Sequence, residues 1–530
     1  MFAGETCMMR HRLSRPRATL AAIGVAMIFA TAAAAQSASV APATMHRIGT
    51  VDERYQSYNV EMIEVTGGRF WRPYSPGLDA AHLQPPPAPS DDDTPAGINS
   101  ALYAYRPPID LTNARLRKLA AALGPAYVRV SGTWANTTYF ADSDETSGNP
   151  PRGFGSVLTH QQWRGVVDFS NAVDATIVTS FAIGAGTRDA QGVWTTLQAE
   201  RFLAYTRAVG GRIVAAEWMN EPTLAAMGGA PAGYSAADYG RDFKIFHAFA
   251  RQSAPEMLIL GPGSVGETAE LKTSDMLAAS LPTHVDAFSY HHYGALSLRC
   301  AAQDHQTTRE AALSEEWLRR TDATLAFYRT LRNEYAPGRP FWLTETADAA
   351  CGGNPWANTF LDTFRYLDQL GRLAKQDVKV VAHNTLVASD YGLLKDKTLE
   401  PKPNYWGALL WRRLMGETVL ESGVPIQEGL HVYAHCLRGT PGGVALLAIN
   451  NSRTRPTSLT LPAGADRFTL EAQQPEASHV LLNGRELGLG PDDGLPSFQG
   501  IHIPPGNVEL APASITFLAI AEARNGSCRN

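Results

Sequence analysis

The sequence predicts an α/β protein: a (β/α)8 TIM barrel followed by an antiparallel β-sandwich. The chain has 530 residues, which suits one barrel of about 250 residues or more plus a further domain. Eight short apolar runs alternate with helical patterns as far as residue 388, and after about residue 415 the helical pattern gives way to short strands. An open, doubly wound sheet is the alternative for the first part.

Residues 1–35 have the composition of a secretory signal peptide. Arginines between Arg10 and Arg17 precede an apolar run from Ala18 to Phe29, and small residues then lead to an A-x-A type cleavage site before Gln36. A membrane anchor is the alternative, but this run is shorter than the roughly 18 to 20 apolar residues of a spanning helix. We therefore expect export to the periplasm or the extracellular space, with no membrane segment after signal cleavage.

The barrel is predicted over residues 59–414. Near-continuous apolar, β-branched runs alternating with helices indicate a parallel sheet covered by helices, and eight such units close into a barrel. Between the first two runs, residues 111–123 place Leu116, Leu119, Ala120 and Leu123 at helical spacing, with Asp110 as the expected N-cap. The eight expected strands are 59–65, 127–132, 174–184, 213–219, 256–261, 286–292, 341–346 and 378–388.

The β-sandwich is predicted over residues 415–530, with residues 36–58 as an N-terminal segment in which residues near 45–55 add a strand to it. Two further segments, 84–98 and 142–155, are rich in polar and turn-forming residues, so we expect surface insertions. Turns at 441–443, 450–451 and 483–484 separate the expected strands of the sandwich. These strands are 431–437, 444–450, 457–461, 467–472, 479–482 and 513–520.

Composition and charge exclude several classes of protein. Hydrophobic residues make up 44% and charged residues 18% of the chain, which excludes a disordered polyelectrolyte and a multi-span membrane protein. The net charge is −5, and because residues 1–35 hold four Arg and one Glu, the remainder carries −8. A nucleic-acid partner is therefore not expected.

The cysteines predict two disulfides. Cys7 leaves with the signal peptide, and an even number of cysteines remains, which favours disulfides in an exported protein. Three pairings exist in principle. Cys300 and Cys351 each follow a strand-like segment in mid-chain, whereas Cys436 and Cys528 bracket the β-rich stretch, so we expect Cys300–Cys351 and Cys436–Cys528. A zinc site is the alternative, but the sequence has no C-x-x-C spacing.

Two carboxylates at strand ends are the candidate catalytic groups. Glu221 lies in the segment Glu217-Trp-Met-Asn-Glu221-Pro after the fourth strand, and Glu345 lies at the end of the seventh. Functional side chains of such barrels gather at the carboxyl ends of the strands. Glycosidic cleavage needs one acid for the leaving oxygen and one carboxylate for the anomeric carbon. An isolated strand-end Glu can equally belong to a buried ion pair, so the pair is more specific than either residue.

Asn-Glu-Pro after strand 4, together with Glu at the end of strand 7, resembles the large clan of retaining glycoside hydrolases built on (β/α)8 barrels. This resemblance implies that Glu221 is the acid/base and Glu345 the nucleophile. It also implies that Asn220 hydrogen-bonds the 2-hydroxyl of the sugar. No cofactor and no metal are expected for this chemistry.

A closer resemblance, to the heparanase family (glycoside hydrolase family 79), covers almost the whole chain after residue 35. Several separate motifs carry it in the same order. They are residues 115–133, WLTET at 342–346 with Cys-Gly-Gly following at 351–353, SDYGL at 389–393, PNYW at 403–406 and VLLNG at 480–484. The cysteines around the terminal β-domain also match the family's C-terminal disulfide.

The resemblance implies a glucuronate pocket. Glu64 corresponds to the acidic residue that ends strand 1, Thr133 to the threonine after the strand 2 glycine, and Tyr391 to the strand 8 tyrosine. Gly352 and Gly353 correspond to the glycine pair whose N–H groups hold the uronate carboxylate. One extra residue within 347–351 separates Glu345 from these glycines, so the loop differs from the family pattern.

The segment His291-His292-Tyr293 closes the sixth strand. Neighbouring residues of a strand face opposite sides, so the two histidines cannot jointly bind one metal ion. We expect His292 and Tyr293 to line the mouth of the barrel, with Tyr293 bonding the nucleophile as in the clan. His291, like His383 and Asn384 on the eighth strand, is expected to be a packed barrel residue.

These features together predict an exported, monomeric, retaining exo-β-glucuronidase. Its substrate would be a carbohydrate with a terminal β-linked glucuronate, on a glycoconjugate or at a polysaccharide end. An endo-enzyme acting within uronate-containing chains is one alternative, but binding a sulfated chain calls for clustered Lys and Arg, and the charge of −8 disfavours it. A catalytically inactive carbohydrate-binding relative is another, although such a protein does not need both glutamates.

Overall fold

The computed structural model describes residues 36–74, 100–144, 149–268, 271–300 and 307–529. The expected signal peptide, the expected insertion at 84–98 and residues 145–148 of the insertion at 142–155 lie outside these described residues. No described helix is both long and apolar enough to cross a membrane.

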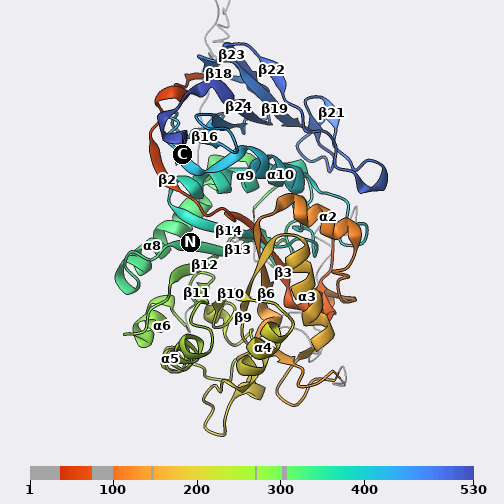
Figure 1. The fold of residues 1–530 in the computed structure, drawn as a ribbon, viewed down its shortest axis with the longest axis vertical. Coiled ribbons are helices and arrows are strands. Elements are labelled where there is room, and N and C mark those ends of the chain that lie inside the picture. Colours follow the sequence, from red (N-terminus) through yellow and green to blue (C-terminus); the bar gives the residue numbers. More distant parts are fainter. Residues whose placement is uncertain (1–35, 75–99, 145–148, 269–270, 301–306, 530) are drawn as a thin grey trace, which may run out of the picture. The chain divides into compact units, whose positions relative to one another are not determined.

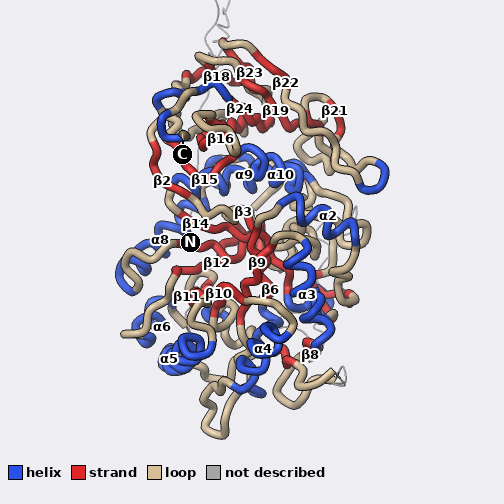
Figure 2. Tube along the Cα trace, in the orientation of Figure 1, coloured by secondary structure: helices blue, strands red, loops and turns tan. Residues whose placement is uncertain are grey.

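Eight parallel strands close into a barrel, which confirms the predicted (β/α)8 architecture and excludes the open sheet (Figures 1 and 2). Each predicted run supplies one strand. The first strand is shifted, since it ends at Glu61 and not at residue 65. In chain order the strands are β3 (Gln56–Glu61), β6 (Ala126–Ser131), β9 (Ala175–Ser180), β10 (Ile213–Glu217), β11 (Leu258–Ser264), β12 (Ala287–Leu296), β13 (Phe341–Ala350) and β14 (Val378–His383).

Helices cover the outside of the barrel. In α2 (Ala114–Leu123) the predicted apolar positions are all buried. The predicted N-cap was wrong: the Asn113 side chain accepts the Leu116 N–H, whereas Asp110 bonds Thr112. The other main helices are α3 (His160–Ala172), α4 (Leu197–Ala208), α5 (Ala236–Ser253), α6 (Thr273–Ser280), α8 (Arg320–Tyr335), α9 (Phe360–Lys375) and α10 (Pro403–Leu414).

Several short elements accompany the barrel strands and the main helices. The helix α1 (Met62–Thr66) follows β3 directly, and α7 (Glu315–Leu318) precedes α8. Two hydrogen-bonded strand pairs lie outside the barrel sheet. These are β4 (Gly68–Trp71) with β5 (Tyr103–Arg106), and β7 (Thr138–Phe140) with β8 (Ser156–Leu158).

The C-terminal region forms two packed sheets. The larger includes β2 (Arg47–Thr50), which pairs with β15 (Met415–Leu420), so the predicted N-terminal addition to this region is confirmed. Its other strands are β16 (His431–Leu437), β17 (Val444–Asn450), β19 (Ala465–Glu471), β20 (Leu481–Leu482), β21 (Arg485–Glu486), β22 (Ile501–Ile503) and β24 (Ser514–Ile520). The smaller consists of β1 (Gln36–Ser39), β18 (Thr457–Leu461) and β23 (Gly506–Leu510).

The two ends of the described chain meet in these sheets. Strand β1 pairs with β18 in parallel, in an otherwise antiparallel arrangement. Near the C-terminus, the Asn525 side chain donates to the carbonyl oxygens of Pro42 and Met45. The N-terminal strands are therefore held by residues from the end of the chain.

The larger sheet packs on both of its faces, which explains why β17 is a continuous apolar run. Val444, Leu446 and Ala448 belong to the core between the two sheets, and the alternate residues Leu447 and Ile449 belong to the core shared with the barrel.

The helix α9 lies between the barrel and the larger sheet. All of its residues from 360 to 374 are buried, and Figure 1 shows it with α10 between β14 and β16. Gly371 permits a close approach, since a Cβ there would lie 2.3 Å from the ring of Tyr433.

A buried ionic cluster joins α9 to the larger sheet. His431 on β16 bonds Asp368 of α9 through Nδ1 at 2.5 Å and bonds Glu315 through Nε2. Arg372 and the Tyr433 hydroxyl also donate to Asp368. Burial opposes a charge on His431, but the two carboxylates outweigh it and raise its pKa to about 9.

Stability should therefore decrease at mildly alkaline pH. Because the pKa of His431 rises from 6.5 to about 9 on folding, its contribution, about 3 kcal/mol, is complete below pH 6.5 and is lost as the pH rises through 9. Urea unfolding between pH 6 and 9.5 should show this loss in the wild type and a flatter profile in His431→Gln. The control is His502→Gln, whose side chain is 76% exposed; equal slopes for wild type and His431→Gln would contradict the assignment.

Candidate active site

A pocket of about 440 Å³ opens at the carboxyl ends of the barrel strands. Pockets that bind small ligands usually measure about 300 to 1,000 Å³. Five of the predicted site residues line it, namely Thr133, Glu221, Tyr293, Glu345 and Tyr391. The structure therefore brings both candidate catalytic carboxylates into one cavity.

The Glu345 carboxylate is fixed by donors on both oxygens. The Tyr293 hydroxyl donates to Oε1 at 2.6 Å, and Arg129 on β6 donates to Oε2 at 2.7 Å. Burial opposes ionisation, but His291, Arg129 and the Tyr293 hydroxyl together lower the pKa of Glu345 below its usual value. The group is thus held as a carboxylate, the form that a nucleophile requires.

The pKa of the Glu221 carboxyl group is shifted in the opposite direction from that of Glu345. Burial and the nearby charge of Glu345 raise its pKa, although the Nδ1–H of His291 donates to Oε1 at 3.0 Å. Its backbone has a φ of +46°, a conformation that non-glycine residues adopt at a cost and that often marks functional sites. Because the pKa of Glu221 is raised and that of Glu345 is lowered, the pocket can hold Glu221 as a protonated acid beside Glu345 as a carboxylate.

Arg129 is a site residue that the sequence analysis does not predict. It is 1% exposed, it donates to Glu217 and Glu345, and its Nη2 also donates to Asn220 Oδ1 at 2.8 Å. Glu217 is fully buried, and despite that burial Arg129 and His291 lower its pKa. Glu217 therefore holds Arg129 in place behind the pocket. The sequence feature that indicates such a role is the position of Arg129, a charged residue in the middle of an apolar strand.

The prediction for Glu64 was wrong. Because β3 ends at Glu61, the next residues enter α1, and Glu64 accepts the Glu61 N–H as the third residue of that helix. Its other oxygen pairs with Arg106 at 2.8 Å. Glu61 lines the pocket instead. The spacing of a capping box, Glu61-x-x-Glu64, was the signal for the early strand end.

The prediction for His292 was also wrong. Its Nδ1 bonds the Thr324 hydroxyl of α8 at 2.9 Å, on the outside of the barrel, and burial lowers its pKa to about 3. His291 and Tyr293 face the pocket because they lie two residues apart on one strand face. The two neighbouring histidines do face opposite sides of the strand, and the one that points into the barrel is His291 and not His292.

The side chain of Asn384 hydrogen-bonds three polar residues in the wall of the pocket. Its Nδ2 lies 3.0 Å from Glu61 Oε1, 3.0 Å from the Tyr293 hydroxyl and 3.3 Å from the Tyr391 hydroxyl. Burial and the charge of Glu345 raise the pKa of Glu61 well above its usual value. Asn384 was expected to be a packed residue, whereas it lines the pocket; His383 is packed as expected, with Nε2 bonded to the Tyr391 carbonyl.

Asn220, Gly352 and Gly353 lie near the pocket but are not among its lining residues. Both glycines have positive φ, at +82° and +86°, and a Cβ on Gly352 would lie 2.6 Å from Trp71 Cβ. Their carbonyls accept hydrogen bonds from Ser389 and Ser297. The roles of these three residues toward a sugar stay predictions.

Both predicted disulfides are present. Cys300 and Cys351 have a Cα–Cα distance of 6.4 Å, and Cys436 and Cys528 one of 5.3 Å, within the usual range for disulfides. Cys351 is itself a lining residue. The first disulfide therefore ties the segment after β13 to the segment after β12 at the edge of the pocket.

Glu221, His291 and Glu345 each have one potential ligand atom within 4.8 Å of the others, a spacing that a metal site would also show. The guanidinium of Arg129 already neutralises Glu345 at 2.7 Å. A second cation beside it would be repelled, so these residues fit a catalytic pair better than a metal site.

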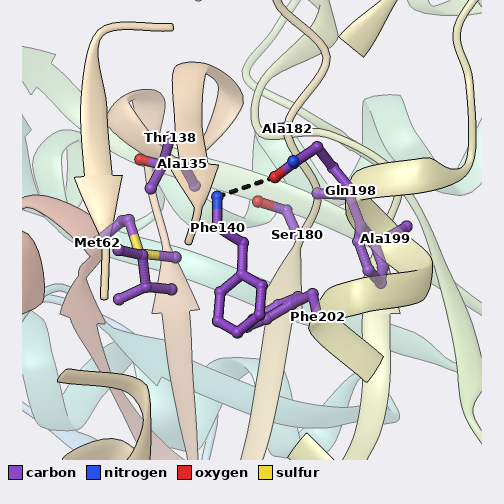
Figure 3. A pocket seen from close by; sticks show the side chains of 11 residues that line it. Met62, Ala135, Thr138, Phe140, Ser180, Ala182, Gln198, Ala199 and Phe202 are labelled. Carbon is purple, nitrogen blue, oxygen red and sulfur yellow. Dashed lines mark hydrogen bonds between the residues drawn. The ribbon is translucent and has the colours of Figure 1, made fainter. Parts of the chain in front are cut away.

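A second, much smaller pocket lies between β7, β9 and α4. Figure 3 shows Met62, Phe140 and Phe202 in its walls, with the Phe140 N–H donating to Gln198 Oε1. Its volume of about 30 Å³ is that of a single water molecule, so it cannot admit a sugar.

The chain is similar to known glycosidases. The family model "Glycosyl hydrolase family 79, N-terminal domain" matches residues 104–371. The chain is 28% identical to heparanase-like protein 1 of Arabidopsis thaliana over 78% of each chain, and 27% identical to mouse heparanase over 79% of this chain and 88% of that one. It is 27% identical to baicalin β-D-glucuronidase of Scutellaria baicalensis over 54% of this chain and 55% of that one.

Solved structures share the fold. A 4-O-α-L-rhamnosyl-β-D-glucuronidase from Fusarium oxysporum matches with a TM-score of 0.59 at 12% identity, covering 92% of this chain and all of that one. A family 51 α-L-arabinofuranosidase from Bifidobacterium longum matches with a TM-score of 0.59 at 14% identity, over 91% of this chain and 99% of the other. At these identities the likeness concerns the fold alone.

Proposed function

Because the chain belongs to glycosyl hydrolase family 79, we propose that this glycoside hydrolase is a retaining exo-β-glucuronidase. One observation carries the mechanism: an oxygen of Glu221 and an oxygen of Glu345 lie within 4.8 Å of each other. Retaining glycosidases hold their two carboxyl groups about 5 to 5.5 Å apart, whereas inverting enzymes need about 6.5 to 9.5 Å to admit water.

The reaction is a double displacement. Glu345 attacks the anomeric carbon while Glu221 protonates the leaving oxygen, which gives a covalent glycosyl-enzyme. Glu221 then removes a proton from water, and that water attacks the anomeric carbon and releases glucuronate with its β configuration retained. Arg129 and Tyr293 keep Glu345 ionised and oriented. Asn220 is assigned to the 2-hydroxyl of the sugar.

The choice of glucuronate rests on the relatives and on the polar wall of the pocket. The relatives include an enzyme named as a baicalin β-D-glucuronidase. Tyr391, with Gly352 and Gly353 beside it, is assigned to the C6 carboxylate of the sugar. Export is proposed from the composition of residues 1–35, and the two disulfides support it, since disulfides persist in oxidising compartments.

Hydrolysis rates on p-nitrophenyl β-glucuronide, β-glucoside and β-galactoside test the function. The glucuronide should be hydrolysed fastest, and proton NMR of the first product should show the β anomer. Preferred hydrolysis of a neutral sugar would refute the glucuronidase assignment, and an initial α anomer would refute retention. Release of free glucuronate and not of oligosaccharides from a polymer would support the exo mode.

Tyr391→Phe should lower kcat/KM on the glucuronide by about 10- to 100-fold, because a hydrogen bond to a charged group contributes roughly 1.5 to 3 kcal/mol. Activity on the glucoside should barely change. The control is Tyr105→Phe, since Tyr105 is 71% exposed. A parallel fall on both sugars would mean that Tyr391 maintains the pocket and that the uronate is recognised elsewhere.

A further inference from the structure

The pocket has two chemically different halves. Glu61, Tyr293, Glu345, Asn384 and Tyr391 form the polar half, and the bonds of Asn384 and Tyr293 join them. They come from β3 and β12 to β14 or the segments just after these strands. The other half follows β6, β10 and β11, and its apolar lining consists of Trp134, Leu224, Met227 and Val265. Four further apolar residues line the pocket from β4, β12 and β13, namely Phe70, Trp71, Leu296 and Ala350.

Glu221 stands at the start of the apolar half. It is followed directly by a 3-10 turn at Pro222–Leu224, so Leu224 and Met227 come three and six residues after the general acid. The Thr268 hydroxyl donates to the Thr223 carbonyl at 3.2 Å and ties the segment after β11 to this turn. An acid must reach the leaving oxygen to protonate it, so the group attached to that oxygen enters the half beyond Glu221.

The half of the pocket beyond Glu221 offers few hydrogen-bonding or charged partners to a polar or anionic group. None of the described lining residues is Lys or Arg, and the four internal segments outside the described residues contain neither residue in their sequence. Besides Glu221, three polar side chains line this half: Glu267, which is acidic, Thr268, whose hydroxyl is bonded within the protein, and Thr133 after β6, which the sequence assigns to the glucuronate. Sulfates and carboxylates would meet a negative charge here without a compensating cation.

On the basis of the proposed function, we infer that this half binds an uncharged aromatic aglycone, so that the substrate is an aryl β-glucuronide. A planar ring can pack against Trp134 and the aliphatic side chains, and the Met227 thioether suits an aromatic edge. The hydroxyls of a sugar aglycone would lose water without gaining partners. Trp134, Leu224, Met227 and Val265 are thus specificity-determining residues for the leaving group.

The test compares two glucuronides whose phenols have similar acidity. One carries 4-methylumbelliferone, and the other carries the anionic 7-hydroxycoumarin-4-acetate. The full-length enzyme should prefer the neutral substrate by about tenfold or more in kcat/KM, the discrimination expected of an apolar subsite. Leu224→Arg and Met227→Lys should each reverse this ratio by lowering activity on the neutral substrate and raising it on the anionic one.

Leu197→Arg is the matched control, since Leu197 is 53% exposed at the start of α4, and it should leave the ratio unchanged. Because both substrates are measured with the same enzyme sample, the ratio of the two rates does not depend on how much of the variant is folded. Equal rates on both substrates in the wild type, or unchanged ratios in both pocket variants, would overturn this inference while leaving the glucuronidase function intact. If glycosides of another sugar are hydrolysed instead, the proposed function fails, and the same two aglycones attached to that sugar still decide the inference.

Discussion

Glu345→Gln should reduce turnover by about 10⁴- to 10⁶-fold, the scale on which removal of a catalytic nucleophile acts. Gln is nearly isosteric, so it can still meet the Tyr293 hydroxyl and Arg129, which lie 2.6 and 2.7 Å from the native carboxylate oxygens. What is lost is the negative charge that forms the bond to the anomeric carbon.

Covalent labelling identifies the nucleophile independently of rates. A 2-deoxy-2-fluoro glucuronide with a good leaving group should trap the glycosyl-enzyme, and peptide mass spectrometry should place the label on Glu345. Glu256→Gln, at an exposed site, should react like the wild type. A label on Glu61 or Glu217 would refute the assignment, and Glu61 is the sharper competitor because it lines the same pocket.

Glu221→Ala should reduce activity in a way that depends on the leaving group. Loss of general acid catalysis costs about 10²- to 10⁴-fold for an alkyl or sugar aglycone, whereas an activated phenol departs without a proton. On p-nitrophenyl glucuronide, kcat/KM should therefore change much less, and the glycosyl-enzyme should accumulate because no base activates water.

Azide and pH provide two further readouts on the same variant. Azide needs no general base, so it should restore turnover of the aryl substrate by Glu221→Ala and give a β-glucuronyl azide, but it should not restore Glu345→Gln. Because burial and Glu345 raise the pKa of Glu221, activity of the wild type falls as the pH rises through that pKa, and this alkaline decline should be absent in the variant. Equal losses on aryl and sugar aglycones would exclude Glu221 as the acid.

The barrel could be predicted from the sequence because local pattern decides it. The run Val444–Asn450 and the eight barrel runs are apolar enough to be read directly as buried strands. Helix α2 shows the limit of this reading, since its apolar face was correct and its N-cap was three residues further on, at Asn113.

The sequence predicts the site residues that lie at strand ends. It does not predict those whose position depends on where the chain turns. Glu221 and Glu345 were found because polar residues interrupt apolar runs. Glu64 was assigned wrongly, since the start of α1 at Met62 decides which carboxylate faces the cavity. Arg129 and Asn384 acquire their roles only through partners far away in sequence, such as Glu345 for Arg129 and Glu61 for Asn384, and no local pattern specifies such pairs.

The pairing of β2 with β15, and the bonds from Asn525 to Pro42 and Met45, have a consequence for how the protein is made. Strands β1 and β2 pair with β18 and β15, which are synthesised only after all eight barrel strands, so the C-terminal sheets cannot close before the barrel has been synthesised. Contacts between distant parts of a chain form slowly because the long intervening loop must first be closed. Until then β1 and β2 remain unpaired strands, the kind of segment that aggregates or is held by chaperones.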